Sequence, residues 1–378
     1  MSQHPVQIPD SAAGQRNRFA AAYSLLKAAI AERAFPGAAF GVLWHGQVVA
    51  MDAVGRFTYE EESPEVTPAT IFDIASLTKV VATTSAAIIL YDRGILDLDL
   101  PLGEVLPGFV IGKEPGSPKQ LVTLRMLLAH SSGLPAYERL FESATTPYEL
   151  LRACLMMPLE AAPMERVLYS DIGFLLLGKA LEVLCGESLD AFCGREVFTP
   201  LGLEGTRFCP PKEWRPAVAP TENDTTFRHR IIQGEVNDEN CSVLGGCAGH
   251  AGLFSSVPDL LSYAKAILSP KTEPSIFRPN TVSLFTTKRV FPTGTSRALG
   301  WDTPAEPRSS GRHFGPRSVG HLGFTGTSMW IDFDRELAIV LLTNRTWPDR
   351  SSQSIKQVRP AFHDAVAAGL PESRRFLP

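Results

Sequence analysis

The sequence has no long apolar run, since none approaches the roughly 18 residues that a helix needs to cross a bilayer. It also has no block of lysine and arginine, and its net charge of −4 and pI near 6.1 give no long-range attraction to polyanions. No internal repeat or low-complexity tract is visible. We therefore expect no membrane span and no nucleic-acid partner.

Cysteine and histidine are present but form no metal-binding pattern. The eight histidines lack His-x-His and His-Glu-x-x-His spacing, and no Cys-x-x-Cys pair occurs. We expect the thiols to be reduced, partly buried residues, and we expect no bound metal. The six cysteines are Cys154, Cys185, Cys193, Cys209, Cys241 and Cys247.

The first 15 residues are polar, include two prolines and lack the apolar core of a signal peptide. This composition predicts a cytoplasmic protein, unless an export signal is missing from the sequence. A chain of 378 residues, with 44% apolar and 20% charged residues, can bury a sizeable core as one large domain or two lobes.

The order of predicted elements favours an α+β fold. An antiparallel sheet assembled from both chain ends, flanked by helices and with an inserted all-α domain, fits this order. Strand-like runs return only near the C-terminus. The predicted segments are an amphipathic helix at 17–34, a hairpin of 38–44 and 47–54 joined at His45-Gly46, a helical stretch at 120–205, strands at 329–333 and 337–343, and a last helix at 354–368.

Ser76 and Lys79 form the most informative pair in the chain. They precede a mostly apolar segment, 80–91, that contains neither glycine nor proline and is predicted to be a buried helix. Residues three apart lie on one helix face, so a lysine amine can act as a base beside a serine hydroxyl. The helix N-terminus also directs backbone N–H groups toward an oxyanion formed nearby.

The Ser-x-x-Lys pattern alone is weak evidence, because it also occurs at Ser24/Lys27 and Ser262/Lys265. Both of these matches lie in segments typical of amphipathic surface helices, where the lysine is solvated. Only Lys79 lies in a segment too apolar to leave it exposed, and a buried lysine without a function is rare. The context therefore favours a catalytic pair at that match.

Two further segments carry chemically reactive residues, each with a structural alternative. Tyr169, Ser170 and Asp171 lie at the entry to an apolar helix, where Ser170 or Asp171 can serve as an N-cap and Tyr169 as core packing. The run 320–327 enters a strand, and a glycine such as Gly323 lets a ligand or a second backbone approach closely. The same run also suits a glycine-rich turn.

These segments together resemble the serine β-lactamase and penicillin-binding-protein superfamily, in particular the branch with class C β-lactamases, DD-peptidases and family VIII esterases. The resemblance covers residues 20 to 345, and the stretches 127–135, 200–203 and 249–255 are similar as well. The family motifs are Ser-x-x-Lys, Tyr-x-Asn and Lys-Thr-Gly or His-Thr-Gly, in this order. They correspond to Ser76-Leu77-Thr78-Lys79, Tyr169-Ser170-Asp171 and His321-Leu322-Gly323.

The resemblance implies one catalytic unit over residues 1–378 with a β-lactamase/transpeptidase-like fold. It implies a sheet lobe from residues 17–75 and 245–378 and a mainly helical lobe from residues 76–244.

The resemblance also implies acyl transfer in two steps without a cofactor. Ser76 attacks an ester or amide carbonyl, Lys79 and Tyr169 share the removal of its proton, and Tyr169 protonates the leaving group. The backbone N–H groups of Ser76 and Phe324 would hold the oxyanion, and water would then hydrolyse the acyl-enzyme. Whether Lys79 or Tyr169 is the resting base stays open, because the two titrate as a coupled pair.

Three positions depart from the family pattern. Asp171 stands where Asn is usual; it would orient Lys79, and the ion pair would keep Lys79 charged, which favours Tyr169 as the proton acceptor. Leu322 lacks the threonine hydroxyl that helps to hold a substrate carboxylate. His321, only partly protonated near neutrality, would hydrogen-bond Tyr169 or the substrate. These departures disfavour anionic β-lactams.

Two other histidines need a separate interpretation. His130, beside Ser131 and Ser132, is expected to be a structural residue at a helix end rather than part of a triad, and no Gly-x-Ser-x-Gly elbow occurs. His250 lies between two glycines, and its loop borders the expected cleft. It is a candidate for substrate contact, with a structural role as the alternative.

We therefore expect a serine hydrolase, and the missing threonine hydroxyl favours a carboxylesterase-like enzyme that acts on small esters. A DD-peptidase or muropeptide amidase is the alternative, because the run 236–240 that leads into 249–252 is similar to relatives associated with peptidoglycan. β-Lactam hydrolysis comes third. A non-catalytic ligand-binding or sensor protein on the same fold is disfavoured, because Ser76, Lys79 and Tyr169 are all present. The expected partner is a small ester, amide or muropeptide, and no oligomeric state follows from the sequence.

Overall fold

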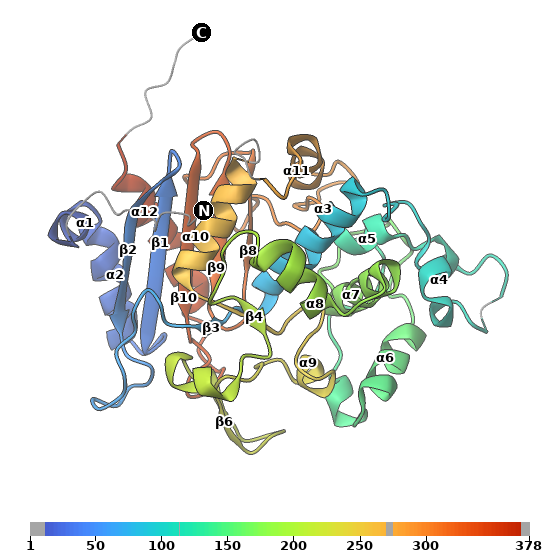
Figure 1. Cartoon of the computed structure of the whole chain (residues 1–378), viewed down its shortest axis with the longest axis horizontal. Helices are drawn as coiled ribbons and strands as arrows, with labels where there is room; N and C mark the ends of the chain where they lie inside the picture. The colour runs from blue at the N-terminus through green and yellow to red at the C-terminus, as the bar shows by residue number, and fades with distance from the viewer. Residues whose placement is uncertain (1–11, 113, 270–274, 372–378) are drawn as a thin grey trace, which may run out of the picture.

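The structure is a computed structural model that describes residues 12–112, 114–269 and 275–371. In these residues a five-stranded antiparallel sheet has the strand order β2-β1-β10-β9-β8, so the two ends of the chain share one sheet, as predicted (Figure 1). β1 pairs with β10 from Ala38 opposite Thr343 to Trp44 opposite Leu337. The strands are β1 (Gly37–Trp44), β2 (Gln47–Gly55), β8 (Ser318–Leu322), β9 (Ser328–Asp332) and β10 (Leu337–Thr343).

The hairpin of β1 and β2 is confirmed at the predicted turn. His45 and Gly46 both have positive φ, 48° and 73°, and such two-residue turns match the right-handed twist of paired strands. The strands predicted at 329–333 and 337–343 are also confirmed, as β9 and β10.

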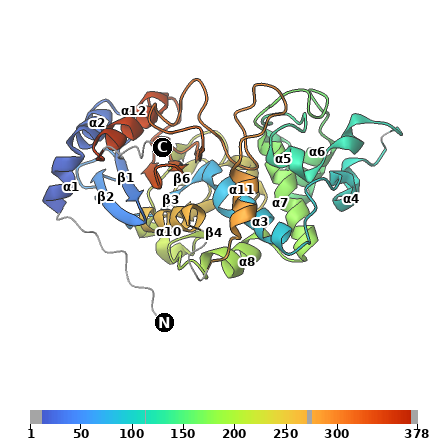
Figure 2. The same ribbon diagram turned by 90° about the horizontal axis from the view of Figure 1, so that it is seen from above.

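Helices cover both faces of the large sheet. α2 and α12 pack on one face and α10 on the other (Figures 1 and 2). On the first face, the rings of Phe40 and Phe362 meet edge to face with centroids 5.4 Å apart. On the second face, a Cβ at Gly41 would lie 2.6 Å from Leu261 and Val257, so the glycine lets α10 approach β1 closely.

The middle of the chain is mainly helical and lies beside the sheet (Figure 1). Its long helix α7 is buried along most of its length, between α5, α6 and the segment that follows Ser76. The helices are α1 (Ala12–Arg18), α2 (Ala20–Ala31), α3 (Ser85–Asp92), α4 (Leu102–Val105), α5 (Leu124–Leu128), α6 (Pro147–Met156), α7 (Asp171–Cys185), α8 (Leu189–Cys193), α9 (Glu239–Val243), α10 (Val257–Leu268), α11 (Pro279–Thr286) and α12 (Ile355–Ala368).

Short helical segments of other types complete the helical part. Two of them, η2 and η6, are π-helical, and the others are 3₁₀-helical. They are η1 (Ala75–Leu77), η2 (Lys79–Thr84), η3 (Pro107–Phe109), η4 (Pro118–Leu121), η5 (Leu140–Glu142), η6 (Gly194–Phe198) and η7 (Lys212–Ala217).

The prediction that strands return only near residue 329 is wrong. β8 was not predicted as a strand, and its residues 320–322 belong to the run for which a glycine-rich turn was one alternative. Gly320 is required in this strand, because an added Cβ would lie 2.3 Å from the Trp330 ring. The other missed strands have two or three residues, too few for a period of two to show. They are β3 (Phe72–Asp73), β4 (Arg207–Phe208), β5 (Glu222–Asp224), β6 (Arg230–Ile232) and β7 (Leu253–Ser255).

The predicted helix at 17–34 is two helices, because α1 ends at Arg18 and α2 begins at Ala20. The polar residues 1–11, on which part of the predicted cytoplasmic location rests, lie outside the described residues. Among the helices that the structure describes, none is long and apolar enough to cross a membrane. The lobe boundaries at 75/76 and 244/245 stay predictions.

Candidate active site

Ser76 lies on a tight turn between the sheet region and the helical region. It is the middle residue of η1, which follows β3 directly. The preceding Ala75 has a φ of 46°, a conformation that is unfavourable for a residue with a side chain. Asp73 holds this turn, since its Oδ1 accepts a hydrogen bond of 2.8 Å from the Ala75 amide. The predicted buried helix at 80–91 follows, as π-helix η2 and then α3.

Lys79 is fully buried and points its amine at Ser76. Nζ lies 3.0 Å from Ser76 Oγ, 2.6 Å from Asp171 Oδ1 and 2.9 Å from the carbonyl oxygen of His250. An ammonium has three N–H donors, and these three acceptors use all of them. The lysines of the other two Ser-x-x-Lys matches, Lys27 and Lys265, are exposed, as the sequence predicted.

Tyr169 reaches the same serine from the start of α7. Its hydroxyl donates to Ser76 Oγ at 3.0 Å. Ser170 forms the N-cap of α7, since its hydroxyl accepts from the Gly173 amide at 2.9 Å. His130 Nδ1 accepts from the Ser170 amide, and the His130 ring lies 4.6 Å from the Tyr169 ring. His130 therefore has the structural position that the sequence predicted.

The charges at Ser76 favour an ammonium beside a neutral phenol. Burial lowers the pKa of Lys79, but the charge of Asp171 and the hydrogen bond to it, together with the interaction with Tyr169, outweigh burial and raise that pKa above its ordinary value. Burial, followed by the charge of Asp171, raises the pKa of the Tyr169 phenol. Neither residue is thus a ready base at neutral pH. Asp171 is the anionic group next to the pair.

The turn between β8 and β9 brings Phe324 to the other side of Ser76. Thr325 Oγ1 donates to the carbonyl of Asp73, and Thr327 Oγ1 donates to the carbonyl of Ile74. An added Cβ at Gly323 would lie 2.0 Å from Thr327 Oγ1, so only glycine allows this approach. In the described residues no hydrogen bond from the amides of Ser76 and Phe324 is found, and their role as an oxyanion hole stays a prediction.

Within the described residues His321 makes no hydrogen bond to Tyr169, one of the two partners that the sequence predicted, and a hydrogen bond to the substrate stays a prediction. Its Nδ1 lies 2.9 Å from the carbonyl oxygen of Leu322, and its ring centroid lies 5.8 Å from that of Tyr169. Burial, with the nearby charges of Lys79 and Arg297, holds the pKa of His321 well below its ordinary value. The side chain is therefore neutral near neutral pH and supplies no positive charge for a substrate carboxylate.

A cavity of about 220 Å³ opens at Ser76. Asp171 and Phe324 line it, and so does His250, whose Nε2 lies 3.0 Å from Asp238 Oδ1. Of the predicted residues, Ser76, Asp171, His250 and Phe324 thus line one hollow, whereas Lys79 and Tyr169 contact Ser76 without lining it, and His321 and Gly323 are not among its lining residues.

Three residues of the site carried no signal that sequence reasoning used. Tyr137 and Arg350 line the cavity, and the Arg297 guanidinium lies 5.3 Å from the centre of the Tyr169 ring. Each comes from a loop distant in sequence from the motifs. From the sequence, a charged residue near a motif could have been named only as a candidate site residue. The residues next to it in the sequence do not determine where its loop lies in the folded protein.

Comparison with known proteins agrees with this geometry. The profile of the family described as Beta-lactamase matches residues 23–359. The chain belongs to this family. It is 33% identical over 346 residues to the N-acetylmuramyl-L-alanine amidase of Bacillus subtilis (strain 168), a match that covers 82% of the chain and 77% of that relative. This family member is therefore a serine hydrolase with the α+β β-lactamase/transpeptidase fold.

Two further similarities cover most of the chain. The putative D-alanyl-D-alanine carboxypeptidase of Escherichia coli (strain K12) is 31% identical over 316 residues, 75% of this family member and 71% of that relative. The solved structure of EstCE1, a hydrolase with promiscuous acyltransferase activity, superposes with a TM-score of 0.72 at 22% identity. It covers 94% of this chain and 100% of that chain, and it supports the fold alone.

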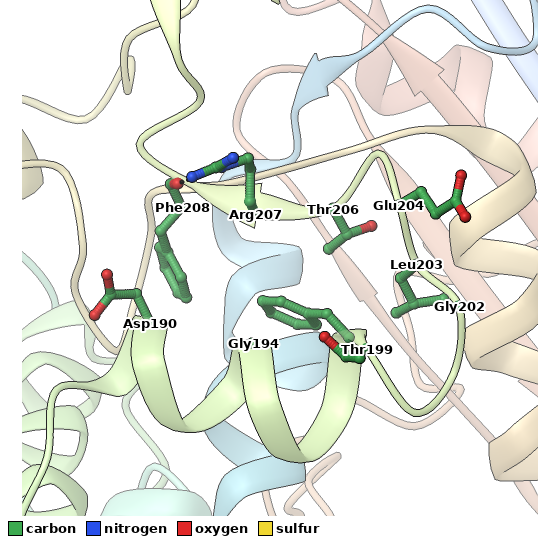
Figure 3. A pocket seen from close by; sticks show the side chains of 10 residues that line it. Asp190, Gly194, Thr199, Gly202, Leu203, Glu204, Thr206, Arg207 and Phe208 are labelled. Atoms are coloured by element: carbon green, nitrogen blue, oxygen red, sulfur yellow. Dashed lines mark hydrogen bonds between the residues drawn. The ribbon is translucent and has the colours of Figure 1, made fainter.

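A second hollow, of about 420 Å³, lies between α8, η6 and β4 of this family member (Figure 3). Asp190 and Glu204 lie at its opposite ends, and Phe208 points into it (Figure 3). It shares no lining residue with the cavity at Ser76. We therefore place the candidate site at the first cavity.

Asp171→Asn should change the pH dependence of this enzyme. In the wild type, Lys79 can take the Ser76 proton while it passes one to Asp171, so activity needs no prior loss of a proton. In the variant the base is neutral Lys79, whose pKa falls because burial remains and the carboxylate is gone. We expect a flat neutral range for the wild type. For the variant, kcat/KM should fall about tenfold per pH unit below the lowered pKa.

The measurement is kcat/KM against pH for both proteins with one substrate, together with thermal unfolding at each pH. A variant that keeps the flat wild-type profile would show that Asp171 does not accept the proton.

Proposed function

We propose that this protein hydrolyses an amide bond of a peptidoglycan fragment through an acyl-enzyme on Ser76. The observation that carries this proposal is the continuous contact from Ser76 Oγ through Lys79 Nζ to Asp171 Oδ1, at 3.0 and 2.6 Å, with the Tyr169 hydroxyl also on Ser76. Cleavage of an amide releases an amine, whose nitrogen must be protonated as it leaves. The alcohol released from an ester depends less on such a proton.

The proton path balances with these groups. Ser76 Oγ attacks the carbonyl and gives its proton to Lys79, which passes one to Asp171. Tyr169 protonates the leaving nitrogen and takes a proton back from Lys79, with which it interacts. Asp171 then returns its proton to Lys79, so that all three groups regain their starting states. The amides of Ser76 and Phe324 would hold the oxyanion. Water then attacks the acyl-enzyme with the same groups in reverse.

The comparisons support the amide over the ester that the sequence favoured first. Relatives that match at 30% identity or more include an amidase and a putative D-alanyl-D-alanine carboxypeptidase. The esterase neighbour supports only the fold. An esterase remains the second candidate, because Leu322 supplies no hydroxyl to hold a carboxylate. The neutral His321 further disfavours β-lactams, since it offers no fixed charge to their carboxylate.

A panel of three substrates tests the proposal. It contains N-acetylmuramoyl-L-alanine, an N-acyl-D-alanyl-D-alanine and p-nitrophenyl butyrate, each with the wild type and with Ser76→Ala. We expect amine release from at least one of the two amides, and none with the variant. Hydrolysis of the ester alone would replace the proposed amidase by an esterase.

A further inference from the structure

The cavity at Ser76 offers hydrogen-bond acceptors that have no partner in the protein. Asn237 is only 3% exposed; its Nδ2 donates to Glu222 at 3.0 Å, but its Oδ1 has no partner among the described residues. This oxygen is not one of the fully enclosed unpaired atoms, so it is accessible, and Asn237 lines the cavity. An accessible amide oxygen without a protein partner can accept a hydrogen bond from a ligand in the cavity.

Asp238 supplies a second acceptor beside the first. Its Oδ1 accepts from the Cys241 amide at 2.7 Å and contacts His250 Nε2 at 3.0 Å, whereas Oδ2 has no partner within the described residues. Burial would raise the pKa of Asp238, but the charge and hydrogen bond of His250 lower it below its ordinary value. Asp238 is therefore a carboxylate near neutral pH.

Two aromatic side chains of the same cavity remain open to solvent. Tyr137 is 37% exposed and Phe324 is 47% exposed. The guanidinium of Arg345 lies 4.3 Å from the centre of the Phe324 ring, and its Nε donates to the Phe324 carbonyl at 2.7 Å. Arg345 thus holds the Phe324 ring in place, and part of the ring surface stays exposed in the cavity that contains Ser76.

These features suit one kind of group. A sugar ring donates through several hydroxyls and has apolar C–H faces that pack on aromatic rings, so it uses both the acceptors and the aromatics. A metal ion does not fit, because in the described residues no three histidine, cysteine or carboxylate side chains are arranged to hold one. The volume of about 220 Å³ is below the about 300–1,000 Å³ of typical ligand pockets, which suits one ring rather than a glycan chain.

We propose that Tyr137, Asn237, Asp238 and Phe324 form a sugar subsite, and that the hydrolysed amide carries a sugar on its acyl side. This inference rests on the proposed function. A lactyl ether joins a muramyl ring to its carbonyl by a short link. With that carbonyl at Ser76, the ring occupies the cavity that Ser76 itself lines.

Binding to Ser76→Ala tests the subsite without turnover. Calorimetry compares N-acetylmuramoyl-L-alanine with N-lactoyl-L-alanine, which has the same amide but no sugar. We expect the sugar amide to bind at least about tenfold more tightly. Asp238→Asn and Tyr137→Ala, each in the Ser76→Ala background, should bring the ratio of the two Kd values close to one. Tyr148→Ala, which removes a 73% exposed tyrosine of α6 outside this cavity, should leave the ratio unchanged.

Equal affinity for the two amides, or a ratio that survives both cavity variants, would overturn the sugar subsite. Tighter binding of L-alanyl-L-alanine, whose acyl part carries an ammonium, would overturn it in favour of a cation subsite. Hydrolysis by the wild type separates the two proposals. Equal turnover of both amides would support the proposed amidase and contradict the sugar subsite. Sugar-dependent binding without turnover of either amide would support the subsite and contradict the amidase.

Discussion

Ser76→Ala should lower the turnover of every substrate of this enzyme to the background rate, a loss on the order of 10⁴-fold or more. The reason is positional, because Lys79 Nζ and the Tyr169 hydroxyl both lie 3.0 Å from Ser76 Oγ. Without that oxygen no acyl-enzyme forms, and the remaining groups can only bind substrate and polarise its carbonyl. The measurement is kcat/KM with the best substrate of the panel.

Ser262→Ala is the matched control, since it removes the serine of another Ser-x-x-Lys match, on α10. It should keep wild-type activity. Thermal unfolding of both variants should show a folded protein. A well-folded Ser76→Ala variant that retained most of the activity would remove this serine from the chemistry and with it the whole site.

Lys79→Ala and Tyr169→Phe should each lower kcat/KM by about 10³-fold, and the double variant should be hardly worse than the worse single one. The two residues belong to one proton path, in which Lys79 takes a proton from Ser76 and returns one to Tyr169, so the loss of either residue interrupts the whole path. Lys79→Ala also leaves Asp171 without its 2.6 Å partner and leaves a fully buried space, so part of its effect is on stability.

Lys265→Ala is the control for Lys79→Ala, because Lys265 is exposed and belongs to a chance match of the motif. Tyr169→Phe removes one oxygen and keeps the ring against His130, so it is the cleaner test. Losses that multiply in the double variant would mean that the two residues act independently rather than in one proton path.

The motif residues could be placed from the sequence because their spacing is local. Ser76 and Lys79 lie three apart on a helical segment, so their 3.0 Å contact follows from helix geometry, although the segment is 3₁₀ and then π rather than regular α. Ser170 as an N-cap and the hairpin at His45-Gly46 are local in the same way.

The walls of the cavity could not be predicted, because they depend on loops that meet only in the folded chain. Tyr137 and Arg350 are more than two hundred positions apart and line one hollow. The state of His321 depends on burial as well. Its sequence position suggested partial charge, whereas its 3% exposure and nearby cations keep it neutral.

The substrate also could not be fixed from the sequence, since the departures at Leu322 and His321 disfavour β-lactams without choosing between amide and ester. The unpaired oxygens of Asn237 and Asp238 can be recognised only from the structure, which shows the partners of the other polar atoms of these side chains. Because these oxygens are acceptors, the cavity suits a polar fragment better than a simple alkyl ester.

The central claim, acyl transfer from an amide to Ser76, is tested most directly by mass spectrometry of the wild type quenched in acid during turnover of each amide of the panel. We predict that the peptide containing Ser76 gains the mass of the acyl part, and that this adduct is absent when Ser76→Ala is treated in the same way. Amide consumption with an acyl group on another residue, or with no adduct on the Ser76 peptide at any quench time, would contradict the account.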